Sequence, residues 1–332
     1  MRIGIPREVK HGESRVALTP AALASLSNVV VEAGAGLGVG FTDEQYVAAG
    51  AKLGDPWQCE LVVKVKELQP VEYRRPRSGQ TVLAFDQFAA DRGLLDAALA
   101  SGATFISYNT VGRQRGQSPI LAPMSAIAGR LAVLMGAWCL QRQNGGSGVL
   151  LSGFDDVPPG KVVIVGAGNA GANALAMAHG LGADITVYAR TDARFAALRS
   201  LHPRAGFKTG PPQVADADLV IGAVFAPGQP SPKLITRQML AGMRRGSALV
   251  DVGIDQGGIA ETSRQTSHAE PTYIEEGVVH YCVPNMPAAC PRTASLALER
   301  AVLPYVRKLM RGEMDDDLRN GIAVTQGRFT AG

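Results

Sequence analysis

The sequence predicts an α/β protein with two doubly wound parallel sheets, in which one domain is inserted into a discontinuous other. Short apolar segments alternate with helical segments through the first third of the chain, which is typical of βαβ units. The alternation resumes after a glycine-rich turn at 143–148. A last long helical segment, Thr293 to Met310, follows this second series, and we expect it to return to the first sheet and cover it. The predicted domains are therefore 1–124 with 292–332, and 125–291.

The elements of the first domain follow from apolar runs and from capping residues. Thr19 before Pro20, and Thr42 or Asp43 further on, are suitable helix N-caps. The segment 125–143 is a long helix too apolar to face water, so we expect it to lie between domains or subunits. The predicted strands are 2–5, 29–32, 61–65, 81–85 and 103–107, and the predicted shorter helices are 20–26, 43–49 and 91–100.

The composition excludes several classes of function. Of the 332 residues, 46% are hydrophobic and 19% charged, which suits a globular protein of about two domains. A net charge of +4 with scattered Lys and Arg provides no basic tract for nucleic acid. The four cysteines have no metal or redox spacing, which favours buried thiols in a reducing compartment. The N-terminus lacks the features of a signal peptide, and the apolar run 127–140 is too short, and is interrupted by Arg130, for a membrane span. We expect a cytoplasmic protein without a metal, a nucleic-acid partner or a membrane partner.

The second domain begins with a strand, 161–165, that runs into three spaced glycines. Gly166 permits the tight turn, Gly168 lets the backbone approach a pyrophosphate, and Gly171 lets the next helix pack closely on the strand. The N-terminus of that helix, which continues through 172–181, offers N–H groups and a positive dipole to phosphates. With a second strand at the expected distance, this context predicts a Rossmann dinucleotide-binding domain.

The end of the second strand, 185–188, indicates which dinucleotide binds. An acidic residue about 20 residues after the glycines would bond the ribose hydroxyls and repel a 2′-phosphate. That position is Ala189, and Arg190, Thr191 and Arg194 follow it. Guanidinium groups bind phosphate through charge-assisted hydrogen bonds. The sequence therefore predicts NADP(H), with NAD(H) as the less favoured alternative. Later strands at 218–222 and 248–252 continue the parallel pattern.

Polar residues at the carboxyl ends of parallel strands are the candidates for substrate chemistry. Arg15 follows the first strand and could bind a carboxylate, and Lys66 could polarise a carbonyl or imine. Gln87 follows the strand 81–85, and Asp255 and Asn285 follow strands of the second domain. Taken singly, a residue of this kind is more often a solvated loop residue than a functional one.

Six segments in order along the chain carry a family resemblance. They are Ile5-Pro6 with Arg15-Val-Ala-Leu-Thr-Pro20, 32–36, Lys64-Val-Lys-Glu67, 121–130, 250–258 and 285–287. Together they resemble the alanine dehydrogenase family, which is related to the NAD-binding component of pyridine nucleotide transhydrogenase. The resemblance implies a substrate domain split by a Rossmann domain, and a homo-oligomer, either a dimer or a hexamer. It also implies hydride transfer between a nicotinamide and the α-carbon of an amino acid or its imine.

The resemblance further implies roles for individual residues. Arg15 would bind the substrate carboxylate and Lys66 the 2-oxo or imino group, with Asn285 also near the substrate. Ser125 and Asp255 would lie beside the cofactor and its nicotinamide. The remaining cofactor-binding set comprises Gly166, Gly168, Asn169, Ala170, Gly171, Ala189, Arg190, Thr191, Arg194, Val224, Ile254, Val283, Asn285 and Met286.

Three positions depart from the family pattern. Gln87 stands where the family has its catalytic His, and a Gln cannot shuttle a proton near neutral pH. Asn109 and Ala126 replace acids. One explanation is an active enzyme in which Lys66 gives or takes the proton, with Asp255 assisting and Asp86 as a weaker candidate. Gln87 then only orients the substrate.

These departures leave several functions open. We favour an NADPH-dependent amino acid dehydrogenase or imine reductase that acts on a 2-oxo acid or imino acid other than pyruvate. The alternatives are a true alanine dehydrogenase and a catalytically inactive NADP(H)-binding protein. A transhydrogenase component would need partner chains.

Overall fold

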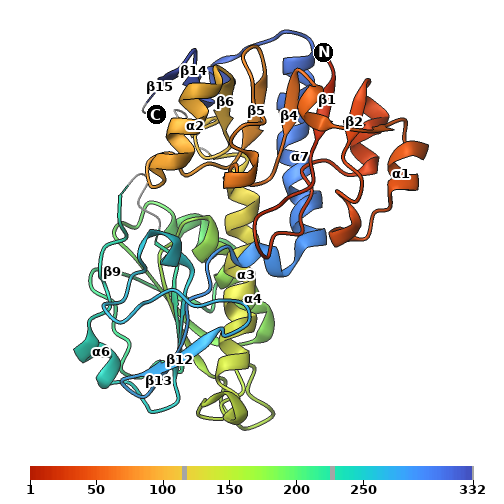
Figure 1. Ribbon diagram of the computed structural model, residues 1–332. Coiled ribbons are helices and arrows are strands. Elements are labelled where there is room, and N and C mark those ends of the chain that lie inside the picture. Colours follow the sequence, from red (N-terminus) through yellow and green to blue (C-terminus); the bar gives the residue numbers. More distant parts are fainter. Residues whose placement is uncertain (114–117, 225–228, 331–332) are drawn as a thin grey trace. The chain divides into compact units, whose positions relative to one another are not determined.

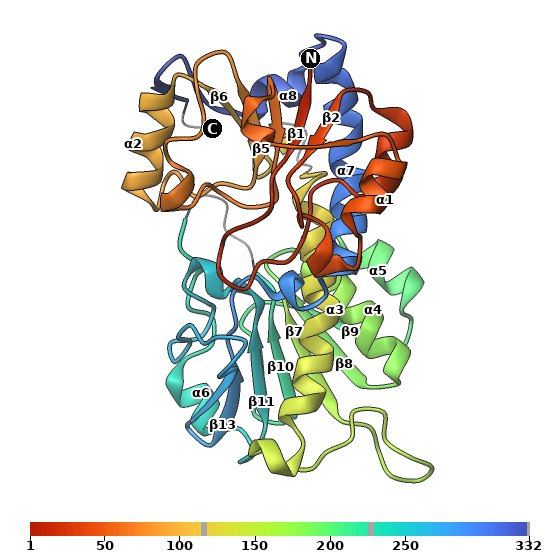
Figure 2. The ribbon, with the colours of Figure 1, turned by 45° about the vertical axis from the view of Figure 1, so that its right-hand side comes forward.

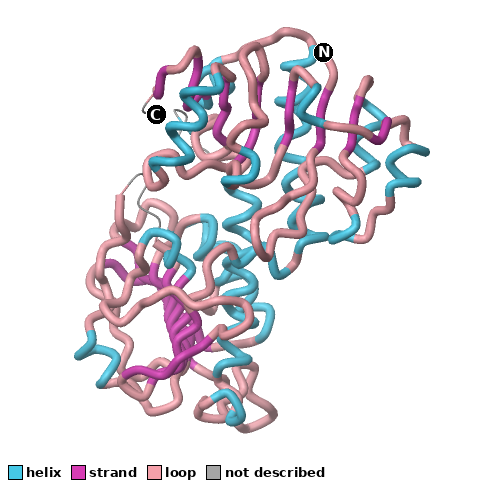
Figure 3. Tube along the Cα trace, viewed as in Figure 1, coloured by secondary structure: helices cyan, strands magenta, loops and turns pink. Residues whose placement is uncertain are grey.

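The computed structural model describes residues 1–113, 118–224 and 229–330. The chain forms two compact units, Met1–Met124 with Cys290–Gly332, and Ser125–Ala289. Each unit is an α/β layer built on one sheet (Figures 1 and 3). The chain passes into the second unit inside one helix and returns to the first at the start of another.

The sheet of the first unit has the doubly wound order. Strands β1 to β6 run parallel in the order β3-β2-β1-β4-β5-β6. At the far edge β14 is antiparallel to β6, and β15 is antiparallel to β14. The fold class predicted from the sequence is confirmed, but this antiparallel edge was not predicted. The strands are β1 Ile3–Ile5, β2 Val29–Val31, β3 Lys52–Leu53, β4 Leu61–Val63, β5 Thr81–Ala84, β6 Thr104–Ser107, β14 Ile322–Thr325 and β15 Arg328–Phe329.

The helices of this unit are fixed by caps and by the returning chain. Thr42 begins α1 with a reciprocal capping box to Gln45. Thr19 occupies the predicted N-cap position before Pro20, but the segment is a 3-10 helix and the Thr19 side chain makes no capping bond. The Thr19 N–H instead donates to Glu299 on the returning helix α7. The helices are α1 Asp43–Ala48, α2 Arg92–Ser101, α7 Pro291–Met310 and α8 Asp316–Gly321, with 3-10 turns at Pro20–Ser25, Leu37–Val39, Pro56–Gln58 and Pro70–Glu72.

The sheet of the second unit repeats the same order. Strands β9-β8-β7-β10-β11-β13 run parallel (Figure 2). Strand β12 is antiparallel to β13 at the edge (Figure 1). The strands are β7 Lys161–Val165, β8 Asp184–Ala189, β9 Gly206–Thr209, β10 Leu219–Gly222, β11 Ala248–Asp251, β12 Thr272–Glu275 and β13 Val278–Tyr281. The helices are α3 Leu121–Cys139, α4 Asn169–Leu181, α5 Phe195–Leu201 and α6 Arg237–Ala241, with 3-10 turns at Arg142–Asn144, Val252–Gln256 and Met286–Ala289.

Helix α3 begins and ends four residues earlier than the predicted 125–143. It ends because the N–H groups of Gly146 and Gly148 turn back to the carbonyls of Gln141 and Leu140. At 19 residues it is long and apolar enough to cross a membrane, so the length argument made from the sequence was wrong. Its inward face, with Ala132 as an example, lies in the core of the second unit. It packs there as a core helix of an α/β layer.

Candidate functional site

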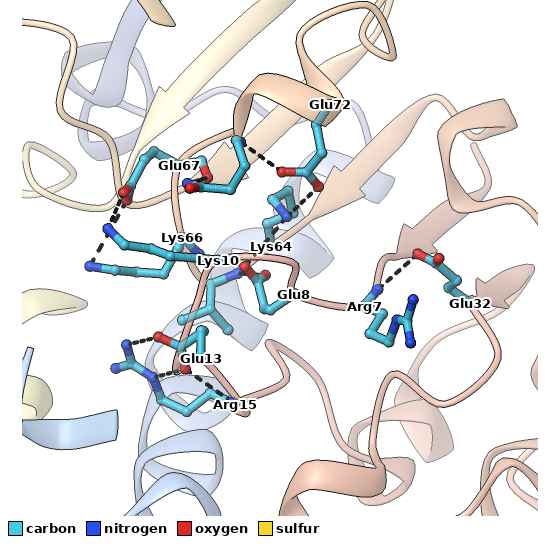
Figure 4. A network of polar contacts seen from close by, with 12 residues as sticks. Arg7, Glu8, Lys10, Glu13, Arg15, Glu32, Lys64, Lys66, Glu67 and Glu72 are labelled. Carbon is cyan, nitrogen blue, oxygen red and sulfur yellow. Dashed lines mark hydrogen bonds and ion pairs between the residues drawn. The ribbon is translucent and has the colours of Figure 1, made fainter. Parts of the chain in front are cut away.

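Arg15 and Lys66 follow the two neighbouring strands at which the winding of the first sheet reverses. From β1 the chain continues to β2 on one side, and from β4 it continues to β5 on the other. In open α/β sheets, ligands bind beyond the carboxyl ends of strands at such a switch point. Arg15 lies in the loop after β1, and Lys66 lies three residues beyond Val63, where β4 ends. Strand β4 is thus shorter than the predicted strand 61–65. The fold therefore brings the two candidates to one edge of the sheet (Figure 4).

Arg15 is buried, with 2% of its surface exposed, and is oriented by Glu13. Its Nε donates to Glu13 Oε1 at 2.7 Å and its Nη2 to Oε2 at 2.5 Å. The next residue fixes the loop to α7, because the Val16 N–H donates to Ser295 Oγ at 3.0 Å. A guanidinium locked in this way is preorganised for a planar carboxylate. Sequence reasoning missed Glu13 because an acid two residues away in a loop has no distinctive spacing.

Lys66 lies between an acid and an aromatic ring. Its Nζ is 4.0 Å from Glu67 Oε2 and 5.7 Å from the centroid of the Phe85 ring. Lys10 forms a second ion pair with Glu67, through Oε1 (Figure 4). Burial alone would raise the pKa of Glu67, but Lys66 and Lys10 outweigh burial and hold the pKa below its ordinary value. Glu67 is therefore an ionised partner of Lys66 at neutral pH.

Glu8 holds the backbone that carries Lys66. Its Oε1 accepts from the Val65 N–H at 2.7 Å, and its Oε2 accepts from the Lys66 N–H at 3.3 Å. The same carboxylate is 3.4 Å from the Nζ of Lys64, which also donates to Glu72 at 2.8 Å. Burial lowers the pKa of Lys64, but the two glutamates more than offset this and raise it overall. Lys64 is therefore a charged structural lysine, whereas Lys66 stays the candidate lysine of the site.

One of the three departures from the family pattern, Asn109, has a local structural explanation. The Gln87 side chain is exposed, and only the Gln87 backbone carbonyl accepts the N–H groups of Ala90 and Asp91 at the entry to α2. Any residue provides such a carbonyl, so the structure gives no reason for a Gln at this position. Asn109 donates through Nδ2 to the Asp86 carbonyl at 2.9 Å. A carboxylate at position 109 could not make this bond, because it has no proton to donate. Asn109 therefore fixes the backbone at Asp86. Nothing in the structure explains Ala126.

The glycine turn of the second unit fits a dinucleotide. A Cβ at Gly166 would lie 2.3 Å from the carbonyl oxygen of Ala223, and one at Gly171 would lie 1.8 Å from the oxygen of Gly166. By contrast, a Cβ at Gly168 would meet open space. Gly168 is also the N-cap of α4, and no side chain caps that helix. The open face and the uncapped N–H groups are what a pyrophosphate needs.

The residues after β8 suit a phosphate. Strand β8 ends at Ala189, and Arg190, Thr191 and Arg194 are exposed in the loop that leads into α5. Neither arginine forms an ion pair with a residue in the described part of the chain. Their charge is therefore available to a ligand.

Asp255 and Asn285 lie together in the second unit. Asp255 is exposed in the turn Val252–Gln256, and its Oδ2 is 3.5 Å from the backbone N of Asn285. That turn is organised from inside by Asp251, which is buried and accepts from Gly253, Ile259 and Ser263.

Lys233 organises the same turn from outside. Its Nζ donates to the carbonyls of Gly257, Gly258 and Ala260 at 2.6 to 3.0 Å. Sequence reasoning missed Lys233, because a single lysine in a loop, outside any recognisable motif, gives no signal.

Of the other predicted cofactor-binding residues, five are buried or half-buried. Ile254, Val283 and Met286 are buried, and the last two belong to the core of the second unit. Burial of these side chains does not test the predicted cofactor-binding role of the three residues, which stays a prediction. Val224 and Ser125 are half-buried.

The chain matches two domain models over almost its whole length. The model described as "Alanine dehydrogenase/PNT, N-terminal domain" matches residues 4–128, and its C-terminal counterpart matches residues 132–332. The chain belongs to the alanine dehydrogenase/PNT family. Members of this family at 43–45% identity over the whole chain identify it as a pyridine-nucleotide-dependent amino acid dehydrogenase acting on CH–NH2 groups.

Individual relatives of the family cover both chains almost completely. An alanine dehydrogenase from Halomonas elongata is 45% identical, over 99% of this chain and 95% of the relative. One from Bacillus subtilis is 44% identical, over 100% and 91%. A solved L-alanine dehydrogenase superposes with a TM-score of 0.95 at 43% identity, covering 99% of this chain and 97% of the other. A transhydrogenase from Sinorhizobium meliloti superposes with a TM-score of 0.86 at 27% identity, covering 99% of each.

Proposed function

We propose that this chain is an alanine dehydrogenase that interconverts alanine with pyruvate and ammonia and uses NADP(H). The observation that carries the proposal is the full-length similarity to curated alanine dehydrogenases together with Arg15 and Lys66 at one switch point. From the sequence alone we favoured a substrate other than pyruvate. The relatives named above support a true alanine dehydrogenase better, so pyruvate replaces that interpretation. Asp255 and Asn285 are the candidate contributions of the second unit.

The residues of the first unit divide the chemistry between them. A bound dinucleotide supplies or accepts the hydride. Arg15, held by Glu13, binds the carboxylate of the substrate. Lys66 polarises the carbonyl or imine, because a positive charge beside that group stabilises the negative charge that develops on it. Gln87 has an amide that orients the substrate but does not titrate.

The preference for NADP(H) rests on the loop after β8. Ala189 removes the acid that would bond a ribose diol, and Arg190 and Arg194 add positive charge where a 2′-phosphate would lie. Thr191 adds a hydroxyl donor. The turn from Gly166 to Gly171, with Asn169 and Ala170 at the start of α4, would hold the pyrophosphate.

A second candidate is reduction of a preformed imino acid. The observation that favours it is Gln87 in place of the family's histidine, because an imine that arrives already formed needs fewer proton transfers than a carbonyl plus ammonia. A homo-oligomer and a cytoplasmic location complete the proposal. The homo-oligomer is supported by partly exposed apolar residues of α3, such as Leu134, which is 43% exposed. The cytoplasmic location is supported by the cysteines, which are all free in the described part of the chain.

One panel tests these proposals together. NADPH and NADH oxidation is measured with pyruvate and other 2-oxo acids, each with and without ammonia, and with cyclic imino acids. We expect turnover with pyruvate plus ammonia, faster with NADPH. Turnover with cyclic imino acids alone would replace the first candidate by the second. Dinucleotide binding without turnover on any member of the panel would contradict both.

A further inference from the structure

Asp86 is a carboxyl group at the tip of β5 with one oxygen left without a hydrogen bond. Its Oδ1 is 3.4 Å from the Phe88 N–H, whereas its Oδ2 is buried and accepts from no described residue. Its backbone is fixed by Asn109. A buried carboxylate oxygen without a donor is costly, so the geometry favours the protonated acid.

A small cavity connects Asp86 with the neighbour of Lys66. The cavity has a volume of about 10 Å³, close to the smallest space that holds one water molecule. Asp86, Glu67 and Ser107 are its polar lining residues, and the rest of the lining is apolar. The Oε2 of Glu67 also accepts no hydrogen bond, and it is the oxygen that lies 4.0 Å from Lys66 Nζ. Asp86 and Glu67 therefore line one cavity, and the carboxylate of Glu67 lies beside the ammonium of Lys66.

The surroundings move the pKa values of Asp86 and Glu67 in opposite directions. Burial raises the pKa of Asp86 and the charge of Glu67 adds to this, while Ser107, the Phe88 N–H and Asn109 oppose it only in part. The pKa of Glu67 is held down by Lys66 and Lys10 against its burial. Helix α2 brings only the apolar Leu94 to the cavity, so no further charge from that side competes. When the pKa values of two neighbouring carboxyl groups are moved apart in this way, one group is suited to act as an acid and the other as a base.

We propose that Asp86 and Glu67 share one proton and serve as the proton reserve of Lys66, in place of the family's histidine. The proposal rests on the function proposed above. Reduction of an imine adds a hydride to carbon, from the dinucleotide, and a proton to nitrogen, from the Lys66 ammonium. Asp86 then releases its proton through the cavity to Glu67, which passes it to the neutral Lys66 amine. Asp86 remains a carboxylate until solvent returns one proton. Asp86 and Glu67 are positioning residues, because they act through Lys66.

The protonated carboxyl can be observed without substrate or cofactor. Infrared spectra of the whole protein, titrated from pH 5 to pH 9, should show a carboxylic-acid C=O band that persists above neutral pH. Asp86→Asn should remove the band, and Asp96→Asn, at an exposed aspartate of α2, should leave it. Glu67→Gln should move the midpoint of the band to lower pH, because the repelling charge is lost. The proposal is overturned if the wild-type spectrum shows no such band. It is also overturned if the band is unchanged in both Asp86→Asn and Glu67→Gln.

Turnover provides the second measurement. With the substrate found in the panel, Asp86→Asn should lower kcat by about 10²-fold with little change in KM. It should also move the alkaline limb of the kcat profile to lower pH, and Asp96→Asn should match the wild type. A merely structural Asp86 would change stability and leave that limb in place, which contradicts the proposal. If no substrate turns over, the proposed function fails while the infrared result still decides whether the proton is shared.

Discussion

Lys64 and Lys66 stand two positions apart beyond the same strand and have different partners. Lys64 is enclosed by Glu8 and Glu72, whereas Lys66 lies beside Glu67 at the carboxyl end of the sheet. Strand alternation would place residues two positions apart on the same face, so it does not explain the difference. Both lysines lie beyond the end of β4, and their different partners distinguish them. The sequence pattern alone predicted the role of Lys66, but the enclosure of Lys64 depends on Glu8, which is distant in the chain.

Substituting each lysine by methionine should separate the two roles. Lys64→Met leaves two buried glutamates without their cation and should cost about 3–5 kcal/mol in unfolding free energy. Lys66→Met should change stability little and abolish turnover. Denaturant unfolding and steady-state kinetics on both variants provide the measurement. Full turnover in Lys66→Met would show that the assignment of Lys66 is wrong.

The pH dependence of stability follows from the direction of the Lys64 shift. Its pKa is higher in the folded protein than in the unfolded chain, so its contribution is complete below the unfolded value of about 10.4. The contribution is lost as the pH rises through the folded value. In Lys64→Met this alkaline loss of stability should be smaller than in the wild type.

We expect Arg190 to determine the proposed preference for NADP(H). Because Arg190 is exposed after β8, Arg190→Ala should leave the fold intact and weaken NADPH binding by about 10-fold or more, which corresponds to the loss of one charge-assisted bond of 1.5–3 kcal/mol. NADH affinity should change little. Arg204→Ala, at another exposed arginine of the second unit, is the matched control. Equal losses for the two cofactors in binding titrations would contradict a phosphate site.

At the scale of elements, the alternating strands and helices were predictable and the sheet edges were not. Strands β12 and β13 are joined by Glu276-Gly277, and β14 and β15 by Gln326-Gly327. All four linking residues have positive φ, as a two-residue hairpin turn requires. Glu and Gln are unusual there, so the Asn-Gly or Asp-Gly signal of such a hairpin is missing from the sequence. The bounds of α3 were wrong for a related reason, because its end depends on glycine N–H groups beyond it.

The turn before α4 provides a matched pair of substitutions. Gly171→Ala places a Cβ 1.8 Å from the Gly166 oxygen, so the helix must move and the protein should lose stability. Gly168→Ala enters open space and keeps an allowed backbone conformation, with φ of −74°. It should fold normally and lose dinucleotide affinity, because its methyl group occupies the approach of the pyrophosphate. Thermal unfolding and a binding titration compare the two. Unchanged affinity in Gly168→Ala would place the dinucleotide elsewhere.

At the scale of the whole molecule, both units use the same strand order, and each places its candidate residues at its own switch point. The reversal between β1 and β4 positions Arg15 and Lys66, and the reversal between β7 and β10 positions the glycine turn. This much follows from parallel strands and their connections, so the sequence was sufficient to predict it. Glu13 and Lys233 were not predictable, because each acts through contacts that exist only once the chain has folded.

The return of the chain at Cys290 determines the order in which the protein can fold during synthesis. The N–H groups of Val16 and Thr19 bond to side chains 279 and 280 residues later, and Thr104 contacts Thr325 across the sheet edge. The second unit is continuous, so it can fold as it emerges, whereas the sheet of the first unit stays uncovered until α7 leaves the ribosome. On chains stalled after Ala289 and the exit tunnel, we expect protease resistance in the second unit alone. Equal resistance in both units would contradict this order. Nascent chains would thus be most exposed to aggregation and to chaperones in the interval between completion of the nucleotide-binding unit and arrival of α7.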